Sequence, residues 1–126
     1  MINSILFYIA GVSLIIWGIS HLFPTRSVVR GFGNISDDNK RIVYMEWINE
    51  GLTLIFIGIL VFFLTFFGDP GSVLQKVLFI VIIVMLIMMS VLSLFTCFRI
   101  NFLPFKMCPV IFTGSAILLL LGLILS

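Results

Sequence analysis

The sequence predicts an all-α polytopic membrane protein, with one domain (residues 1–126) folded as a bundle of four transmembrane helices. Of the 126 residues, 62% are hydrophobic and only 10% are charged. A soluble domain is typically about 45–50% apolar and about 25% charged. The charged residues here are too few to cover a soluble surface. Four apolar stretches also reach the roughly 20 residues that a helix needs to cross a bilayer.

The predicted spans follow one another with turn-forming residues between them. They cover residues 4–22, 42–67, 72–98 and 105–125. Pro24 ends the first span, and the segment Gly68–Gly71 predicts a tight turn between the second and the third. Ser36, followed by Asp37 and Asp38, is typical of a helix N-cap with acidic residues in the first turn. We therefore expect the second helix to begin before its apolar stretch.

The N-terminus and the cysteines exclude two other classes of protein. Residues Met1–Ser4 include no Lys or Arg, so the first apolar stretch is expected to be a retained span and not a cleaved signal peptide. Cys97 and Cys108 form no CxxC motif, which argues against a disulfide framework and a thiol-redox enzyme. We expect both cysteines to be reduced packing residues.

Basic residues are concentrated on one side of the predicted topology. Six of the seven lie in or beside the first and third loops: Arg26, Arg30, Lys40, Arg41, Arg99 and Lys106. Loops that stay in the cytoplasm carry an excess of Lys and Arg. We therefore expect a multi-pass protein of the inner (plasma) membrane, with loops one and three in the cytoplasm and both termini outside.

Glu46 and Glu50 are the strongest pointers to function. They lie one helical turn apart near the start of the second apolar stretch, where a charge in hydrocarbon costs about 2.5–3.5 kcal/mol. Two such carboxylates repel when both are ionised, so one can keep a proton and act as an acid beside the other as a base. Alternatively, both lie at a shallow depth, neutralised by Arg99, Arg41 or Arg30.

The other polar residues of the spans gather toward the same side of the membrane. His21, the only histidine, is the third predicted catalytic residue, as a proton shuttle to a glutamate; it could equally lie in the headgroup region. An arginine could orient a polar headgroup, and the tryptophans could form pocket walls. The predicted ligand-binding residues are Trp47, Asn49, Arg30, Arg99 and Trp17.

The sequence predicts no metal site and no cofactor. One histidine and two glutamates are a possible ligand set, but such residues are too few here to specify a site. A redox role would require a bound quinone. The expected partners are membrane lipid, a lipophilic small molecule and a second membrane-embedded chain, either another copy or a different protein; nucleic acid is not expected.

Glycines at helical spacings predict close helix contacts, because small residues let backbones approach in lipid. These glycines are Gly11, Gly18, Gly51, Gly58, Gly114 and Gly122. They also leave open a different interpretation, in which the stripes Gly11/Gly18 or Gly114/Gly122 dock another membrane protein.

The segment Gly18-Ile19-Ser20-His21-Leu22-Phe23-Pro24 resembles the end of the first helix in the DoxX-like group of small four-helix membrane proteins. The resemblance extends to chain length and to the number of spans. It implies the four-helix fold, and the group includes subunits linked to quinone or thiosulfate oxidation. No cofactor motif of that group is carried by residues of this chain.

The one-sided cluster favours a cytoplasm-facing intramembrane pocket that binds a lipophilic small molecule, with Glu/His acid–base catalysis of an isomerase or hydrolase type. A channel or transporter needs polar lining through most of the bilayer, and the outer half offers little beyond Ser13, Thr65 and Ser90. Two alternatives stay open: an oligomeric proton-coupled transporter and a non-catalytic partner subunit.

Overall fold

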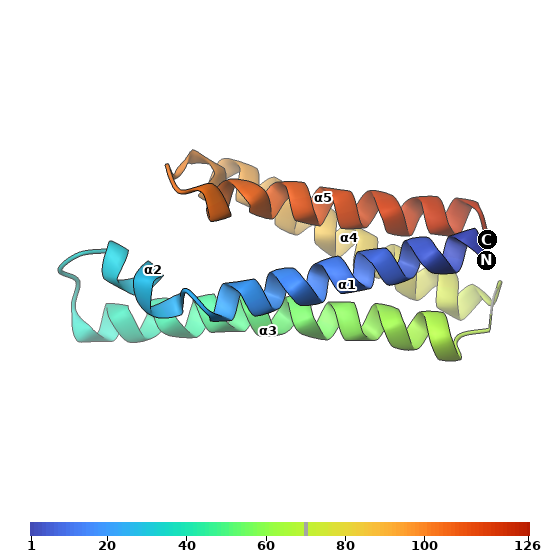
Figure 1. Ribbon diagram of the computed structural model, residues 1–126, viewed down its shortest axis with the longest axis horizontal. Helices are drawn as coiled ribbons and strands as arrows, with labels where there is room; N and C mark the ends of the chain where they lie inside the picture. The colour runs from blue at the N-terminus through green and yellow to red at the C-terminus, as the bar shows by residue number, and fades with distance from the viewer. Residues whose placement is uncertain (70) are drawn as a thin grey trace.

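The computed structural model describes residues 1–69 and 71–126 and confirms the all-α fold. Figure 1 shows long helices running side by side, with both termini at the same end of the bundle. The long helices are α1 (Ile2–Leu22), α3 (Asp37–Phe67), α4 (Val73–Phe95) and α5 (Leu103–Ile124). Two short elements complete the described chain, α2 (Thr25–Gly31) after α1 and a 3-10 turn η1 (Cys97–Arg99) after α4.

The four long helices confirm the predicted spans in number and order, and each is long and apolar enough to cross a membrane. α3 begins at Asp37 because Ser36 caps it, accepting a hydrogen bond from the backbone N–H of Asn39 at 3.2 Å. α4 ends at Phe95, earlier than the predicted residue 98. Thr96 leaves the helical conformation, with φ −118° and ψ −86°, and starts the 3-10 turn.

The segment after Pro24, which the sequence predicts as a loop, includes the short helix α2. Its Val28 and Val29 side chains are buried, and the helix packs against α3. Figure 1 shows α2 at the end of the bundle opposite the termini. The loop after α2 turns at Gly33, whose φ of +70° is readily adopted by glycine.

Glycines bring α1 and α3 into close contact. A Cβ atom on Gly18 would lie 2.6 Å from the carbonyl oxygen of Gly51, and one on Gly51 would lie 2.9 Å from that of Gly18. Gly11 and Gly58 repeat this contact nearer the termini, where a Cβ on Gly58 would lie 2.7 Å from the carbonyl oxygen of Gly11. The two helices therefore pack backbone to backbone, as the glycine spacing predicts.

Two further glycines have different outcomes. Gly122 lies against the ring of Phe7, whereas nothing lies within 4 Å of a Cβ placed on Gly114. The prediction of a close helix contact is therefore wrong for Gly114. Gly11, Gly18 and Gly122 are buried inside the bundle, so these three glycines already make contacts within the chain, and the docking of another protein stays a prediction.

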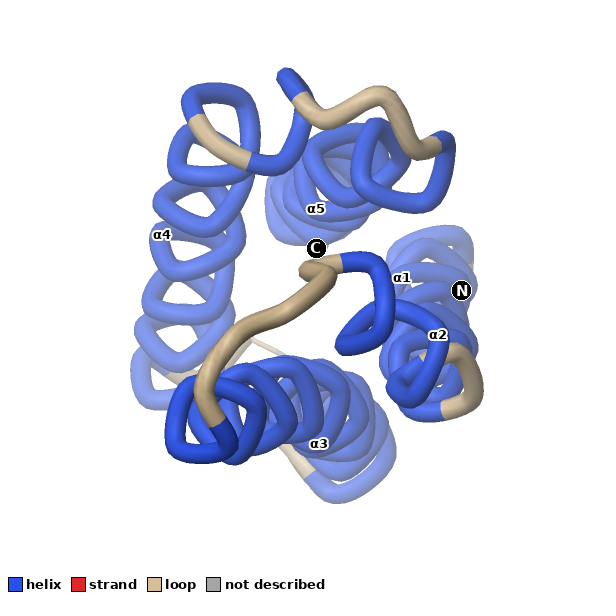
Figure 2. Tube along the Cα trace, turned by 90° about the vertical axis from the view of Figure 1, so that its left-hand side faces the viewer, coloured by secondary structure: helices blue, strands red, loops and turns tan. Residues whose placement is uncertain are grey.

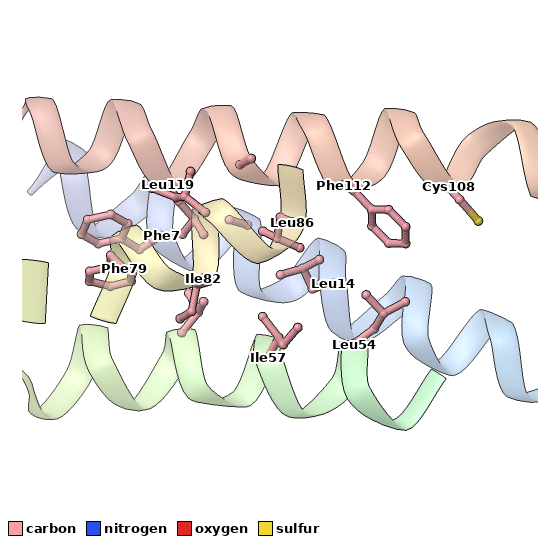
Figure 3. Close-up of a cluster of buried hydrophobic side chains, with 14 residues drawn as sticks. Phe7, Leu14, Leu54, Ile57, Phe79, Ile82, Leu86, Cys108, Phe112 and Leu119 are labelled. Atoms are coloured by element: carbon pink, nitrogen blue, oxygen red, sulfur yellow. The ribbon is translucent and has the colours of Figure 1, made fainter. Parts of the chain in front are cut away.

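A cluster of fourteen buried side chains fills the centre of the bundle (Figure 3). Leu14, Leu54, Leu86 and Phe112 each have a relative exposure of 0%. Toward the termini the core is closed by Phe7 stacked on a phenylalanine of α4, Phe79, with ring centroids 4.2 Å apart. No water-filled path therefore crosses this half of the described chain.

The opposite half of the bundle is less closely packed. α4 leans away from α3 and packs along α5 (Figures 1 and 2). The hydroxyl of Ser90 fixes this pairing, because it donates to the carbonyl oxygen of Pro109 at 3.2 Å and lies 2.6 Å from the hydroxyl oxygen of Thr113. The divergence of α3 and α4 leaves an opening that Glu46 and Glu50 face.

Candidate functional site

The break at Pro24 creates the first part of the site. When a helix ends, its last carbonyl groups lose their helical partners and need others. The carbonyl oxygen of His21 accepts from the indole nitrogen of Trp47 on α3 and from the hydroxyl of Thr25 at 3.4 Å. Trp47 and Thr25 thereby fasten the end of α1 to α3 and α2.

The imidazole of His21 is enclosed by aromatic rings. It stacks on Trp47, with centroids 4.6 Å apart and an interplanar angle of 27°. Trp17, one turn earlier on α1, meets it edge-on at 5.8 Å. The exposed fraction of His21 is only 3%. The side chain therefore lies in the interior of the bundle.

The hydrogen bonding of His21 fixes which nitrogen carries a lone pair. Nδ1 lies 3.3 Å from the carbonyl oxygen of Trp17. A carbonyl can only accept, so Nδ1 carries the hydrogen and Nε2 of the neutral ring carries the lone pair. Nε2 is buried without a hydrogen-bond partner, and it faces Oε1 of Glu50 at 3.6 Å.

A third group completes this cluster from another helix. Cys108 of α5 is 2% exposed, and Figure 3 shows its side chain pointing into the bundle beyond Phe112. Its sulfur, the Glu50 carboxylate and a ring nitrogen of His21 all lie within 4.8 Å of one another. The His21–Glu50–Cys108 cluster thus joins α1, α3 and α5.

Glu50 also connects this cluster to a cavity of about 560 Å³ between α3 and α4. One wall carries Glu46, Glu50 and Thr53 of α3, together with Asn49. Ser93 and Cys97 contribute polar atoms from the other side. Thr96 also lines the cavity. The other lining residues are apolar or aromatic: Val28, Phe32, Ile42, Val43, Trp47, Met85, Met89, Leu92, Ile100, Phe105 and Phe112.

The structure therefore brings together most of the residues that the sequence singled out. Glu46, Asn49, Glu50 and Trp47 line the cavity, and His21 and Trp17 lie directly behind it. Glu46 differs from Glu50 in being exposed. Among residues 1–69 and 71–126, the carboxylates within 4 Å of a basic side chain are Glu50, beside His21, and Asp37, beside Lys40, so no arginine neutralises Glu46 or Glu50 there.

The two arginines do not join the site. Arg30 on α2 and Arg99 on η1 are exposed, and neither is among the described residues that line the cavity. The structure does not bring them to the cavity, and their role as ligand-orienting groups stays a prediction. Arg99 sits beside the cavity mouth, because its neighbours Cys97 and Ile100 are lining residues.

Sequence reasoning missed the part that Cys108 plays, and with it the proximity of α5 to His21. A cysteine near the start of an apolar helix gives no signal of its own. The signal that was present is position along the helix, because Cys108 and His21 both lie near the loop-side ends of their helices. Only the packing of α1 against α5 turns that shared position into a contact.

Comparisons with known proteins add no family assignment. The chain matches no protein-family model, no curated protein and no solved structure.

Proposed function

We propose that this chain is an integral membrane protein that binds a lipophilic small molecule in the cavity between α3 and α4. The cavity itself is the observation that carries the proposal. Its volume of about 560 Å³ falls within the roughly 300–1,000 Å³ range of ligand pockets. Apolar walls with a few convergent polar groups suit a molecule with a hydrophobic body and one polar end.

The polar end of the ligand is proposed to lie against Glu50. The side chain of Glu50 is 30% exposed while that of His21 is 4% exposed, so the carboxylate reaches the cavity and the imidazole supports it from behind. Such a pair can pass a proton to or from a bound polar group. This supports acid–base chemistry of an isomerase or hydrolase type, with Glu46 as a second carboxylate on the same wall.

The proposal includes an orientation in the inner membrane, with loops one and three in the cytoplasm. The support is the clustering of Arg26, Arg30, Lys40, Arg41, Arg99 and Lys106 beside those loops. The cavity opens at that end, so it would be filled from the inner leaflet or the cytoplasm. The resemblance of residues 18–24 to DoxX-like proteins stays part of this proposal as a relationship of fold.

Blocking the cavity tests the proposal. Thr53→Trp places an indole in the cavity, whereas Ile59→Trp adds the same group to the outer face of α3, where Ile59 is 42% exposed. Small molecules that co-purify with each detergent-extracted protein would be quantified by mass spectrometry. We expect a compound carried by the wild type and Ile59→Trp but lost from Thr53→Trp. No such compound, or its equal retention by Thr53→Trp, would overturn the proposal.

A second variant tests the polar contact separately. Glu50→Gln keeps the shape of the cavity and removes the charge that faces His21. We expect weaker retention of the co-purifying compound, with Asp38→Asn, a carboxylate of α3 outside the cavity, as the control. Equal retention by the two variants would contradict the role of Glu50 but not the binding of the compound in the cavity.

The packed core disfavours transport by a single chain. Phe7, Phe79, Val61 and Leu119 are 0–5% exposed and close the half of the bundle that holds the termini. A path across the membrane would therefore require an interface between copies. Uptake by proteoliposomes that is driven by a pH gradient would favour the oligomeric transporter instead.

A further inference from the structure

We propose that His21, Glu50 and Cys108 together bind a divalent transition metal ion of the zinc type. They present one nitrogen, one oxygen and one sulfur ligand from α1, α3 and α5, and these atoms lie within 4.8 Å of one another. Imidazole, carboxylate and thiolate are the three ligand types that zinc takes in proteins. The inference uses the same residues as the proposed function, but metal binding itself requires no lipophilic ligand.

The buried nitrogen of His21 is the second, independent observation. Nδ1–H donates to the carbonyl oxygen of Trp17, which is the arrangement that orients a metal-binding histidine through its other nitrogen. The lone pair of Nε2 is then left buried without a hydrogen-bond partner and directed at a carboxylate oxygen 3.6 Å away. A lone pair and a carboxylate that face each other at this distance are stabilised by a cation between them, which can be a proton or a metal ion.

The spacing of the three atoms suits a metal ion. Ligands at 2.0–2.3 Å around a tetrahedral zinc ion lie roughly 3.3–3.8 Å from each other. The Nε2–Oε1 distance of 3.6 Å falls in this range, and the sulfur of Cys108, within 4.8 Å of both atoms, would move closer to them on binding. On binding, the thiol loses its proton to water, so one metal–sulfur bond replaces one S–H bond.

The surroundings favour a cation with an open coordination position. Glu50 connects the cluster to the cavity, so a water molecule or the polar end of a ligand can occupy the fourth position, as in catalytic zinc sites. Glu46 adds a second negative charge to the same wall. Among the described residues that line the cavity there is no lysine or arginine to compete with the ion.

Metal content and cobalt spectroscopy test the inference without any ligand or activity. The full chain would be purified in detergent through an affinity tag that holds no histidine, and then titrated with Zn²⁺ or Co²⁺ alone. We expect about one ion per chain, and with Co²⁺ a sulfur-to-metal charge-transfer band together with the visible bands of a tetrahedral site. A lack of binding, or a cobalt spectrum without the sulfur band, would overturn the inference.

Variants identify the ligands. Cys108→Ser and His21→Ala are each expected to weaken binding by more than the roughly tenfold that losing an outer-shell partner costs. Cys97→Ser is the matched control, because Cys97 lies outside the cluster. Cys108→Ala removes the sulfur ligand and has a smaller side chain. If gel filtration shows that this variant is monodisperse, its loss of metal binding is due to lost coordination and not to misfolding. Unchanged affinity in folded Cys108→Ser and His21→Ala proteins would overturn the inference.

The two proposals fail separately. If Thr53→Trp loses the co-purifying compound and the wild type binds no metal, the cavity proposal is supported and the metal proposal is overturned. If metal binds through Cys108 and neither the wild type nor any variant carries a compound, the metal proposal is supported and the lipophilic-ligand proposal is overturned.

Discussion

Trp47 holds His21 at two points. Its indole nitrogen donates to the backbone carbonyl oxygen of His21, and its ring lies on the imidazole with centroids 4.6 Å apart. The first contact satisfies a carbonyl that the helix break leaves free, and the second fixes the plane of the ring. Trp47 is therefore a positioning residue: it sets where Nε2 of His21 meets Glu50.

Replacing Trp47 is expected to destabilise the protein. Trp47→Phe keeps an aromatic ring against His21 but loses the hydrogen bond, which lowers the free energy of unfolding by about 0.5–1.5 kcal/mol. Trp17→Phe is the control, because the indole nitrogen of Trp17 is buried without a partner and its loss removes no hydrogen bond. The free energies of unfolding of both variants are measured by titrating dodecyl sulfate into mixed detergent micelles. Equal stability of the two variants would contradict the role of Trp47.

Filling the glycine contact should separate α1 from α3. Gly18→Ala places a Cβ 2.6 Å from a backbone oxygen of Gly51, which cannot rotate away, so the helices must shift at a cost of about 1–3 kcal/mol. Gly114→Ala meets nothing within 4 Å and should be neutral or stabilising by up to about 1 kcal/mol. The melting temperatures in detergent provide the comparison. A Gly18→Ala protein as stable as Gly114→Ala would refute the close packing.

The hydroxyl of Ser90 should contribute to the pairing of α4 with α5. Ser90→Ala removes the hydrogen bonds to Pro109 and Thr113, and we expect a loss of about 0.5–1.5 kcal/mol. Ser20→Ala removes only a bond within its own exposed helical turn and should change the stability little. A double-mutant cycle with Thr113→Val measures the side-chain pair directly. Additive effects would show that the pair is not coupled.

Cysteine labelling tests the proposed orientation. In a background with Cys97→Ser and Cys108→Ala, Asn34→Cys marks the first loop and Asp69→Cys marks the exposed turn after α3. A membrane-impermeant maleimide added to intact cells should label Asp69→Cys, and should label Asn34→Cys only after permeabilisation. The reverse pattern would invert the topology and place the cavity mouth on the outer side.

The spans could be predicted from the sequence because the hydropathy of a segment depends only on its own residues. The cap at Ser36 was equally readable, since its hydrogen bond is made to Asn39 only three residues away. The spacing of the glycines within a helix predicted close helix contacts, but not that α1 and α3 make them. Each of these features depends on residues within a few turns of one another.

The missed features depend on contacts between distant segments. α2 has only seven residues and is stabilised by burying Val28 and Val29 against α3, so its own sequence carries a weak signal. Arg99 was expected to pair with a glutamate because both lie near the loop side, but the 3-10 turn leaves it exposed. Cys108 joins His21 only because α5 packs against α1.

The divergence of α3 and α4 bears on how tightly the proposed lipophilic ligand would have to bind. Side chains at the border of the opening, such as Met85, Leu92 and Ile42, are 44–64% exposed on helices that span the membrane, so the gap faces acyl chains laterally. A hydrophobic compound partitions into the bilayer and is already enriched there when it reaches the gap. Even a modest intrinsic dissociation constant would then suffice to keep the protein saturated at a low aqueous concentration of that compound.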